Sequence, residues 1–86
     1  MPTISMFFGI IIRMFFRGEH QSPHFHAFYQ DYEAAFDMDG DLIDGHMPQK
    51  QRNLIKAWAT LHQDELLADW KLAENKEPLY PIDPLR

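Results

Sequence analysis

Short apolar runs separated by turn-forming residues make up the first part of the chain. Residues 3–8 and 10–16 are rich in Ile, Phe and Met and meet at Gly9, which favours a tight turn or a bend within one long strand. In the second run, every other residue from Ile10 to Phe16 is apolar, so these side chains share one face of a strand. The pattern predicts two strands whose shared apolar face lies in the core.

Alternation of polar and apolar residues continues further along the chain. Residues 24–29 and 32–38 are expected to form two more strands, the second with the period of a half-buried antiparallel strand. The pair Asp39 and Gly40 is typical of a type I′ hairpin turn, in which both central residues have positive φ. Residues 41–44 would then form a short return strand.

The second half of the chain has the pattern of helices. Residues 49–75 contain no Gly or Pro, and Pro48 suits the first turn of a helix. The apolar spacing slips by one step near Gln63 and Asp64, which indicates two helices meeting there or one kinked helix, and we favour two. The apolar stripe consists of Leu54, Trp58, Leu61, Leu66, Leu67 and Trp70.

Strands followed by helices are the α+β pattern. We therefore expect an α+β fold in which an N-terminal antiparallel β-meander of four or five strands is packed by a C-terminal helical pair. Residues 1–86 are expected to form one small domain, with an extended tail over residues 78–86 that contains three prolines.

Composition narrows the function classes. The 13 acidic and 8 basic residues give a formal net charge of −5, which argues against nucleic-acid binding by this chain alone. The absence of cysteine excludes disulfides, thiolate metal ligands and thiol catalysis. The apolar stretch 4–16 includes Arg13 and is shorter than the roughly 20 residues of a membrane helix, so we expect no membrane association. Without a secretory pattern, we expect a cytoplasmic protein.

Histidines supply the densest candidate chemistry. His24 and His26 are two apart on a predicted strand and should share a face, and His20 could fold back from the loop before them. Three neutral imidazoles suit zinc or another divalent metal, with Glu19 orienting one imidazole from outside. Alternatively, these histidines bond backbone carbonyls and hold the loop in place.

His62 lies in the helical half, where it stacks with Trp58 and Leu66 at four-residue steps. It either satisfies a buried acceptor or lines a pocket with the strand histidines, and Glu65 is a second candidate to orient an imidazole. No residue is assigned a catalytic role, and the sequence leaves open whether the protein is an enzyme.

Charged segments suggest two further sites. Residues 31–44 hold six acids and no base, and Asp37, Asp39 and Asp41 begin like a calcium loop. The sixth loop position is leucine and the twelfth is proline, so an EF-hand is excluded and a solvated hairpin, or an acidic patch for a basic partner, is expected.

A small basic cluster begins the helical half. The cluster consists of Lys50, Arg52 and Lys56, and with two short helices it would resemble a helix-turn-helix motif. The following segment is acidic, however, and would repel phosphate. DNA binding would therefore need a partner that supplies positive charge.

Several of these segments together resemble the bacterial family catalogued as domain of unknown function 4160. The resemblance covers residues 2 to about 70, with Ser22 where the family usually has a second proline. It rests on Pro2-Thr3-Ile4, on Gly9-Ile10-Ile11-Ile12, on Glu19-His20, on Pro23-His24-Phe25-His26, and on Trp58, His62, Glu65, Leu66 and Trp70. The resemblance implies a protein of uncharacterised activity. It also implies a gene that often lies beside a gene of a second family, domain of unknown function 2442, in a pairing of toxin–antitoxin type.

Three functions follow as hypotheses. The leading one is a protein-interaction component of a two-gene, toxin–antitoxin-like module, with the adjacent gene product of the 2442 type or a second copy as partner. The alternative is a histidine-centred metal-binding protein or metal-dependent enzyme that uses residues 23–26. The third is a DNA-binding accessory that acts with a partner.

Overall fold

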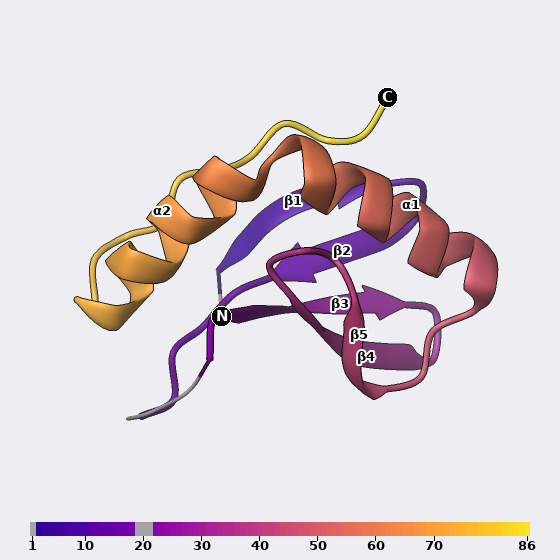
Figure 1. Ribbon diagram of the computed structural model, residues 1–86, viewed down its shortest axis with the longest axis horizontal. Coiled ribbons are helices and arrows are strands. Elements are labelled where there is room, and N and C mark those ends of the chain that lie inside the picture. Colours follow the sequence, from indigo (N-terminus) through magenta and orange to yellow (C-terminus); the bar gives the residue numbers. More distant parts are fainter. Residues whose placement is uncertain (1, 19–21) are drawn as a thin grey trace.

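The computed structural model describes residues 2–18 and 22–86 of the chain. Within them, the strands pair in the order β1-β2-β3-β4-β5, every neighbouring pair antiparallel, and two helices follow (Figure 1). The elements are β1 (Thr3–Phe7), β2 (Ile10–Arg13), β3 (His24–Tyr29), β4 (Tyr32–Asp37), β5 (Leu42–Gly45), α1 (Gln49–Leu61) and α2 (Gln63–Glu74). The α+β prediction of a meander packed by a helical pair is confirmed.

A tight turn joins β1 to β2. Phe8 and Gly9 both have positive φ, at 49° and 79°. Gly9 therefore lies in the turn of a β-hairpin and does not bend one long strand. Strand β2 is shorter than predicted and ends at Arg13, the last residue of β2 that pairs with both β1 and β3.

The turn between β4 and β5 differs from the predicted type I′ turn. Gly40 has a φ of 86°, but Asp39 is not in the positive-φ region. The N–H of Gly40 donates to the carbonyl oxygen of Asp37, and the Asp37 carboxylate accepts the N–H groups of Asp39 and Asp41. This side-chain bonding favours a turn with one positive-φ residue, because it satisfies the loop amides locally.

The two helices meet at His62, close to the predicted junction. Its backbone φ of −125° ends α1, and its N–H donates to the carbonyl oxygen of Trp58. Helix α1 begins at Gln49, so Pro48 stands just before the first turn rather than within it, and its carbonyl accepts the N–H of Arg52.

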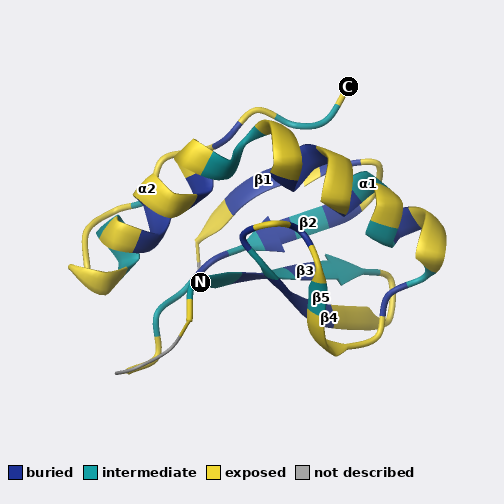
Figure 2. Cartoon of the chain, in the orientation of Figure 1, coloured by how far each residue is buried: buried dark blue, intermediate teal, exposed yellow. Residues whose placement is uncertain are grey.

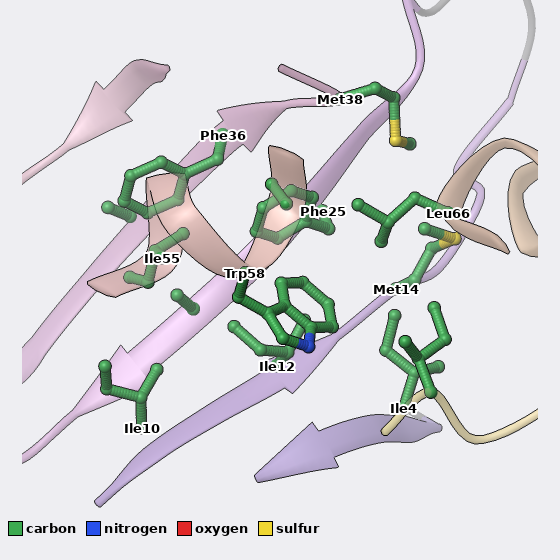
Figure 3. Close-up of a cluster of buried hydrophobic side chains, with 14 of the residues drawn as sticks. Ile4, Ile10, Ile12, Met14, Phe25, Phe36, Met38, Ile55, Trp58 and Leu66 are labelled. Atoms are coloured by element: carbon green, nitrogen blue, oxygen red, sulfur yellow. The ribbon is translucent and has the colours of Figure 1, made fainter. Parts of the chain in front are cut away.

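The core lies between the sheet and the two helices, which cover the same face (Figures 1 and 2). Ile10, Ile12 and Met14 are fully buried, as their alternation predicted. Trp58 packs its ring against Phe25, with ring centroids 5.7 Å apart (Figure 3). Burying each large side chain of this kind contributes about 1.5–3 kcal/mol.

The predicted helical stripe is only partly correct. Trp58, Leu66 and Trp70 are buried, but Leu61 is 69% exposed and Leu67 is 41% exposed. The core takes Ile55 and Ala59 from α1 instead. Ile55, Trp58 and Ala59 share one face of α1 at helical spacing, and Leu61 lies off that face.

The sheet face opposite the helices is called the outer face here. Cross-strand register places its side chains in rows, because directly paired residues point to the same side. Among its members are Met6, Ile11, Arg13, His24, His26, Phe28, Glu33, Ala35, Asp37 and Asp44. In the described part of the chain, neither helix crosses this face, and no helix is long and apolar enough to span a bilayer.

Residues 78–86 follow α2 without further helix or strand. Their backbone bonds to the rest of the molecule at three points. Ile82 N–H donates to the Ile4 carbonyl at 2.7 Å, Trp58 Nε1 donates to the Asp83 carbonyl, and the N–H of Tyr80 donates to the Asp69 carboxylate. The tail thus lies along β1 and both helices.

Candidate functional site

Two of the predicted histidines come together on the outer face. The fully buried Phe25 lies between them in sequence and points to the core, so His24 and His26 both point away from it. Their ring centroids are 5.3 Å apart with a 69° angle between the planes. Strand alternation alone produces this pairing, as the sequence indicated.

A backbone carbonyl orients the His24 ring. Nδ1 of His24 lies 2.9 Å from the carbonyl oxygen of Ser22, and because a carbonyl can only accept, Nδ1 carries the proton. Nε2 is then the lone-pair nitrogen, available to a metal or a donor. The same ring lies 5.1 Å from that of Trp70, so His24 occupies the end of the sheet that α2 reaches.

The His26 imidazole packs against an aromatic side chain. It stacks on Phe15 with centroids 4.6 Å apart and planes 15° apart. Burial lowers the pKa of His26, and the adjacent His24 lowers it further. The carboxylates of Glu33 and Asp44 act in the opposite direction. The net lowering favours an uncharged imidazole at neutral pH.

A hollow of about 260 Å³ opens beside His26. Its floor contains Ala35 and Gly45, whose small size leaves the space open, and the exposed carboxylates of Glu33 and Asp44 border it. Gly45 has a φ of 88°, and a Cβ there would collide with the carbonyl oxygen of Glu33. The close approach of β5 to β4 at the edge of the hollow therefore requires glycine at this position.

The structure describes two of the three histidines predicted to bind a metal. His20 and Glu19 lie outside the described residues, and His24 and His26 are the two described imidazoles of that set. Within residues 2–18 and 22–86, the one group of three ligand-type side chains with ligand atoms within 4.8 Å of one another is acidic. It consists of Asp37, Asp39 and Asp41, where Asp37 caps the turn amides and Asp41 pairs with Lys56 at 2.9 Å.

His62 and Glu65 form a separate pair in the helical layer. Nδ1 of His62 donates to Oε1 of Glu65 at 2.7 Å, and the imidazole lies 5.8 Å from the Trp58 ring. Glu65 therefore orients His62. The pair lies on the core side of the sheet, whereas His26 lies on the outer face.

The basic cluster predicted for DNA binding is partly neutralised. Lys56 pairs with Asp41, and both line a second hollow of about 150 Å³ together with Arg52. The acidic hairpin therefore lies against α1, where a DNA-binding surface would need free cations.

Several site residues were not predicted. Ala35 on β4, Asp44 on β5 and Phe15, which follows the end of β2, surround His26. Of these, only Phe15 continues the alternation of Ile11 and Arg13 along the predicted strand 10–16. Ala35 and Asp44 join the site through the pairing of β3 with β4 and of β4 with β5. Hairpin loop lengths could have suggested this register, but the bulge between Ala35 and Phe36 shifts it.

Comparison with known proteins identifies the family. No curated protein and no solved structure matches the chain. A family model matches residues 9–71, which include both histidines of β3 and most of the helical pair. The chain therefore belongs to the family described as Domain of unknown function (DUF4160).

Proposed function

We propose that this chain is a protein-interaction component of a two-gene, toxin–antitoxin-like module in the cytoplasm, and that it docks protein through the outer face. The observation that carries the proposal is an antiparallel sheet covered by helices on one face only, with apolar side chains on the other. Met6 is 62% exposed, and Ile11 and Phe28 are half-buried. Apolar side chains gathered on one face are typical of interaction surfaces.

The gain from covering this face is hydrophobic. Each Å² of apolar surface removed from water contributes about 25 cal/mol, so a protein laid across Met6, Ile11 and Phe28 gains from all three. Arg13 lies over the Phe28 ring, 5.2 Å from its centroid. Aromatic and arginine side chains of this kind are enriched in protein interfaces.

The test is co-expression with the product of the adjacent gene, expected to be of the domain of unknown function 2442 type. Phe28→Glu, on the outer face, is expected to abolish the complex on size-exclusion chromatography. Leu61→Glu, equally drastic but on the helical layer, should leave it intact. Circular dichroism checks that both variants fold. Absence of any Phe28-dependent complex, either with the adjacent gene product or between two copies of this chain, contradicts the proposal. Loss of the complex only with Leu61→Glu contradicts it as well.

A metal-binding protein or metal-dependent enzyme is the second candidate. It is supported by His24, whose Nδ1–H bonds the Ser22 carbonyl and leaves Nε2 as a lone pair, the arrangement that commonly orients metal-binding imidazoles. The lowered pKa of His26 also favours the neutral form that metals require. Zinc, with His20 as a third ligand, fits this donor chemistry.

A further inference from the structure

The outer face changes in charge and size from one side of the sheet to the other. One cross-strand row runs through it in direct register, from β2 to β5: Arg13, His26, Ala35 and Asp44. A cation stands at one end and a carboxylate at the other. Between them, a large ring on β3 adjoins the small Ala35 on β4, over which the hollow of about 260 Å³ opens.

The flanking rows repeat this asymmetry. In the row of Ile11, Phe28 and Glu33, the apolar side chains are on β2 and β3 and the carboxylate is on β4. In the next row, His24 on β3 pairs with Asp37 on β4. The β2–β3 half of the face thus carries the large and basic side chains, and the β4–β5 half carries the acidic and small ones.

We propose that the outer face is occupied by a second copy of this chain, related by a two-fold axis that runs parallel to the strands between β3 and β4. This inference rests on the proposed function, which makes the face a protein-docking surface. The axis exchanges β2 with β5 and β3 with β4. Arg13 then lies opposite the partner's Asp44, and His26 lies opposite the partner's Ala35, above the hollow.

Self-complementarity favours a second copy over an unrelated protein. A two-fold interface uses the same patch twice, so the patch must complement itself after rotation. Here each half supplies what the other lacks, in charge and in size. An unrelated partner would need a surface complementary to the outer face, but the two halves of the outer face would not need to complement each other.

The state of Arg13 supports the same arrangement. Its Nε is buried and has no hydrogen-bond partner within the described residues, while the guanidinium lies over Phe28. A buried donor without an acceptor is costly, and pairing of the same guanidinium with a carboxylate from a facing protomer would offset that cost. The two sheets would pack as aligned layers about 10 Å apart, with the helices outermost.

The experiment is sedimentation velocity of the full chain over a range of concentrations. We expect a dimer. Arg13→Glu and Asp44→Arg should each raise the dimer dissociation constant at least about 10-fold, because each places like charges opposite one another twice. The double variant Arg13→Glu/Asp44→Arg should restore the dissociation constant to within about 3-fold of the original, by the logic of a double-mutant cycle.

Two further variants protect the test against folding artefacts. Ala35→Gln fills the hollow without removing a core side chain, and should also weaken the dimer at least about 10-fold. Leu61→Glu, on the helical layer, should leave the dimer unchanged. Thermal melts verify folding, and if Arg13→Glu fails to fold, Ala35→Gln decides.

A chain that is monomeric at all concentrations overturns the inference. So does a dimer insensitive to Ala35→Gln, or folded single variants that the double variant does not rescue. A monomer that still forms the Phe28-dependent complex with the adjacent gene product would refute only the second copy. The proposed function would then stand with a different occupant on the same face.

Discussion

The indole Nε1 of Trp58 donates a hydrogen bond to the backbone carbonyl oxygen of Asp83 at 2.8 Å. One side chain thereby joins the sheet, α1 and the C-terminal tail, because the same fully buried ring contacts Phe7 and Phe25. Residues far apart in the sequence meet in a single core.

Trp58→Ala is therefore expected to lower the free energy of unfolding by about 3–5 kcal/mol, through the cavity that it leaves. The measurement is the urea midpoint of unfolding. Trp70→Ala should act in the same direction, since Trp70 is 3% exposed. Tyr80→Ala is the control, with a side chain 70% exposed and an expected change below about 0.5 kcal/mol. A midpoint unchanged by Trp58→Ala would contradict the core assignment.

Asp69, which holds the C-terminal tail, makes the stability of the fold depend on pH. Its side chain is 1% exposed, Oδ1 accepts the N–H of Tyr80, and Oδ2 has no partner within the described residues. Burial raises the pKa of Asp69, the Tyr80 N–H opposes this, and the nearby Glu65 adds to it. The folded state therefore binds the proton more tightly than the unfolded state does.

The resulting contribution to stability is fully present below the ordinary pKa of 3.8 and is lost as pH rises through the folded-state pKa. Asp69→Asn removes the titration, so we expect the wild type to lose stability relative to this variant as pH rises from 4. Urea unfolding of both proteins at a series of pH values provides the comparison. Parallel pH profiles would refute the assignment.

The contribution of His26 to the pH dependence of stability has the opposite sign to that of Asp69. Its pKa is lowered, mainly by burial, so the unfolded state binds the proton more tightly. Stability is thus expected to fall as pH drops from 6.5 through the folded-state pKa. His26→Gln should flatten this part of the profile, whereas His46→Gln, at an exposed position, serves as the matched control. Equal flattening by both substitutions would show that the effect does not come from His26.

Zinc tests the second candidate function. If His24 and His26 bind metal, Zn²⁺ should raise the melting temperature at pH 7.5, and the effect should disappear by about pH 5.5, where protons compete for the imidazoles. The double variant His24→Ala/His26→Ala should abolish the shift, and His62→Ala should preserve it. Melting curves unmoved by Zn²⁺, Ni²⁺, Mn²⁺ and Fe²⁺ would exclude the metal-binding hypothesis.

Gly40 is under a steric constraint that Gly18 does not share. Both have positive φ, but a Cβ at Gly40 would lie 2.9 Å from the Lys56 Cα and 2.9 Å from the Ala59 Cβ. At Gly18, nothing lies within 4 Å. We expect Gly40→Ala to destabilise the protein by about 1–3 kcal/mol more than Gly18→Ala, measured by urea unfolding, because helix α1 must move. Equal effects would mean that backbone strain alone accounts for both.

Local residue patterns specify which segments form strands and which form helices. Alternation in residues 24–29 and 32–38 and the helix-forming run after Pro48 are local patterns, so they predicted β3, β4 and both helices to within about two residues. The same alternation placed His24 and His26 on one face. These features need no knowledge of the rest of the chain, because the side chain period is set by the backbone of each element.

Packing between elements sets which residues of each strand and helix come into contact. The rotation of α1 against the sheet buried Ile55 and left Leu61 exposed, although both are apolar and lie on one helix. The register of β2 to β5 aligned Arg13 with His26, Ala35 and Asp44, and the small residues there opened the hollow. Cross-strand neighbours depend on hairpin geometry and bulges, and helix rotation depends on the whole core, so neither follows from a local pattern.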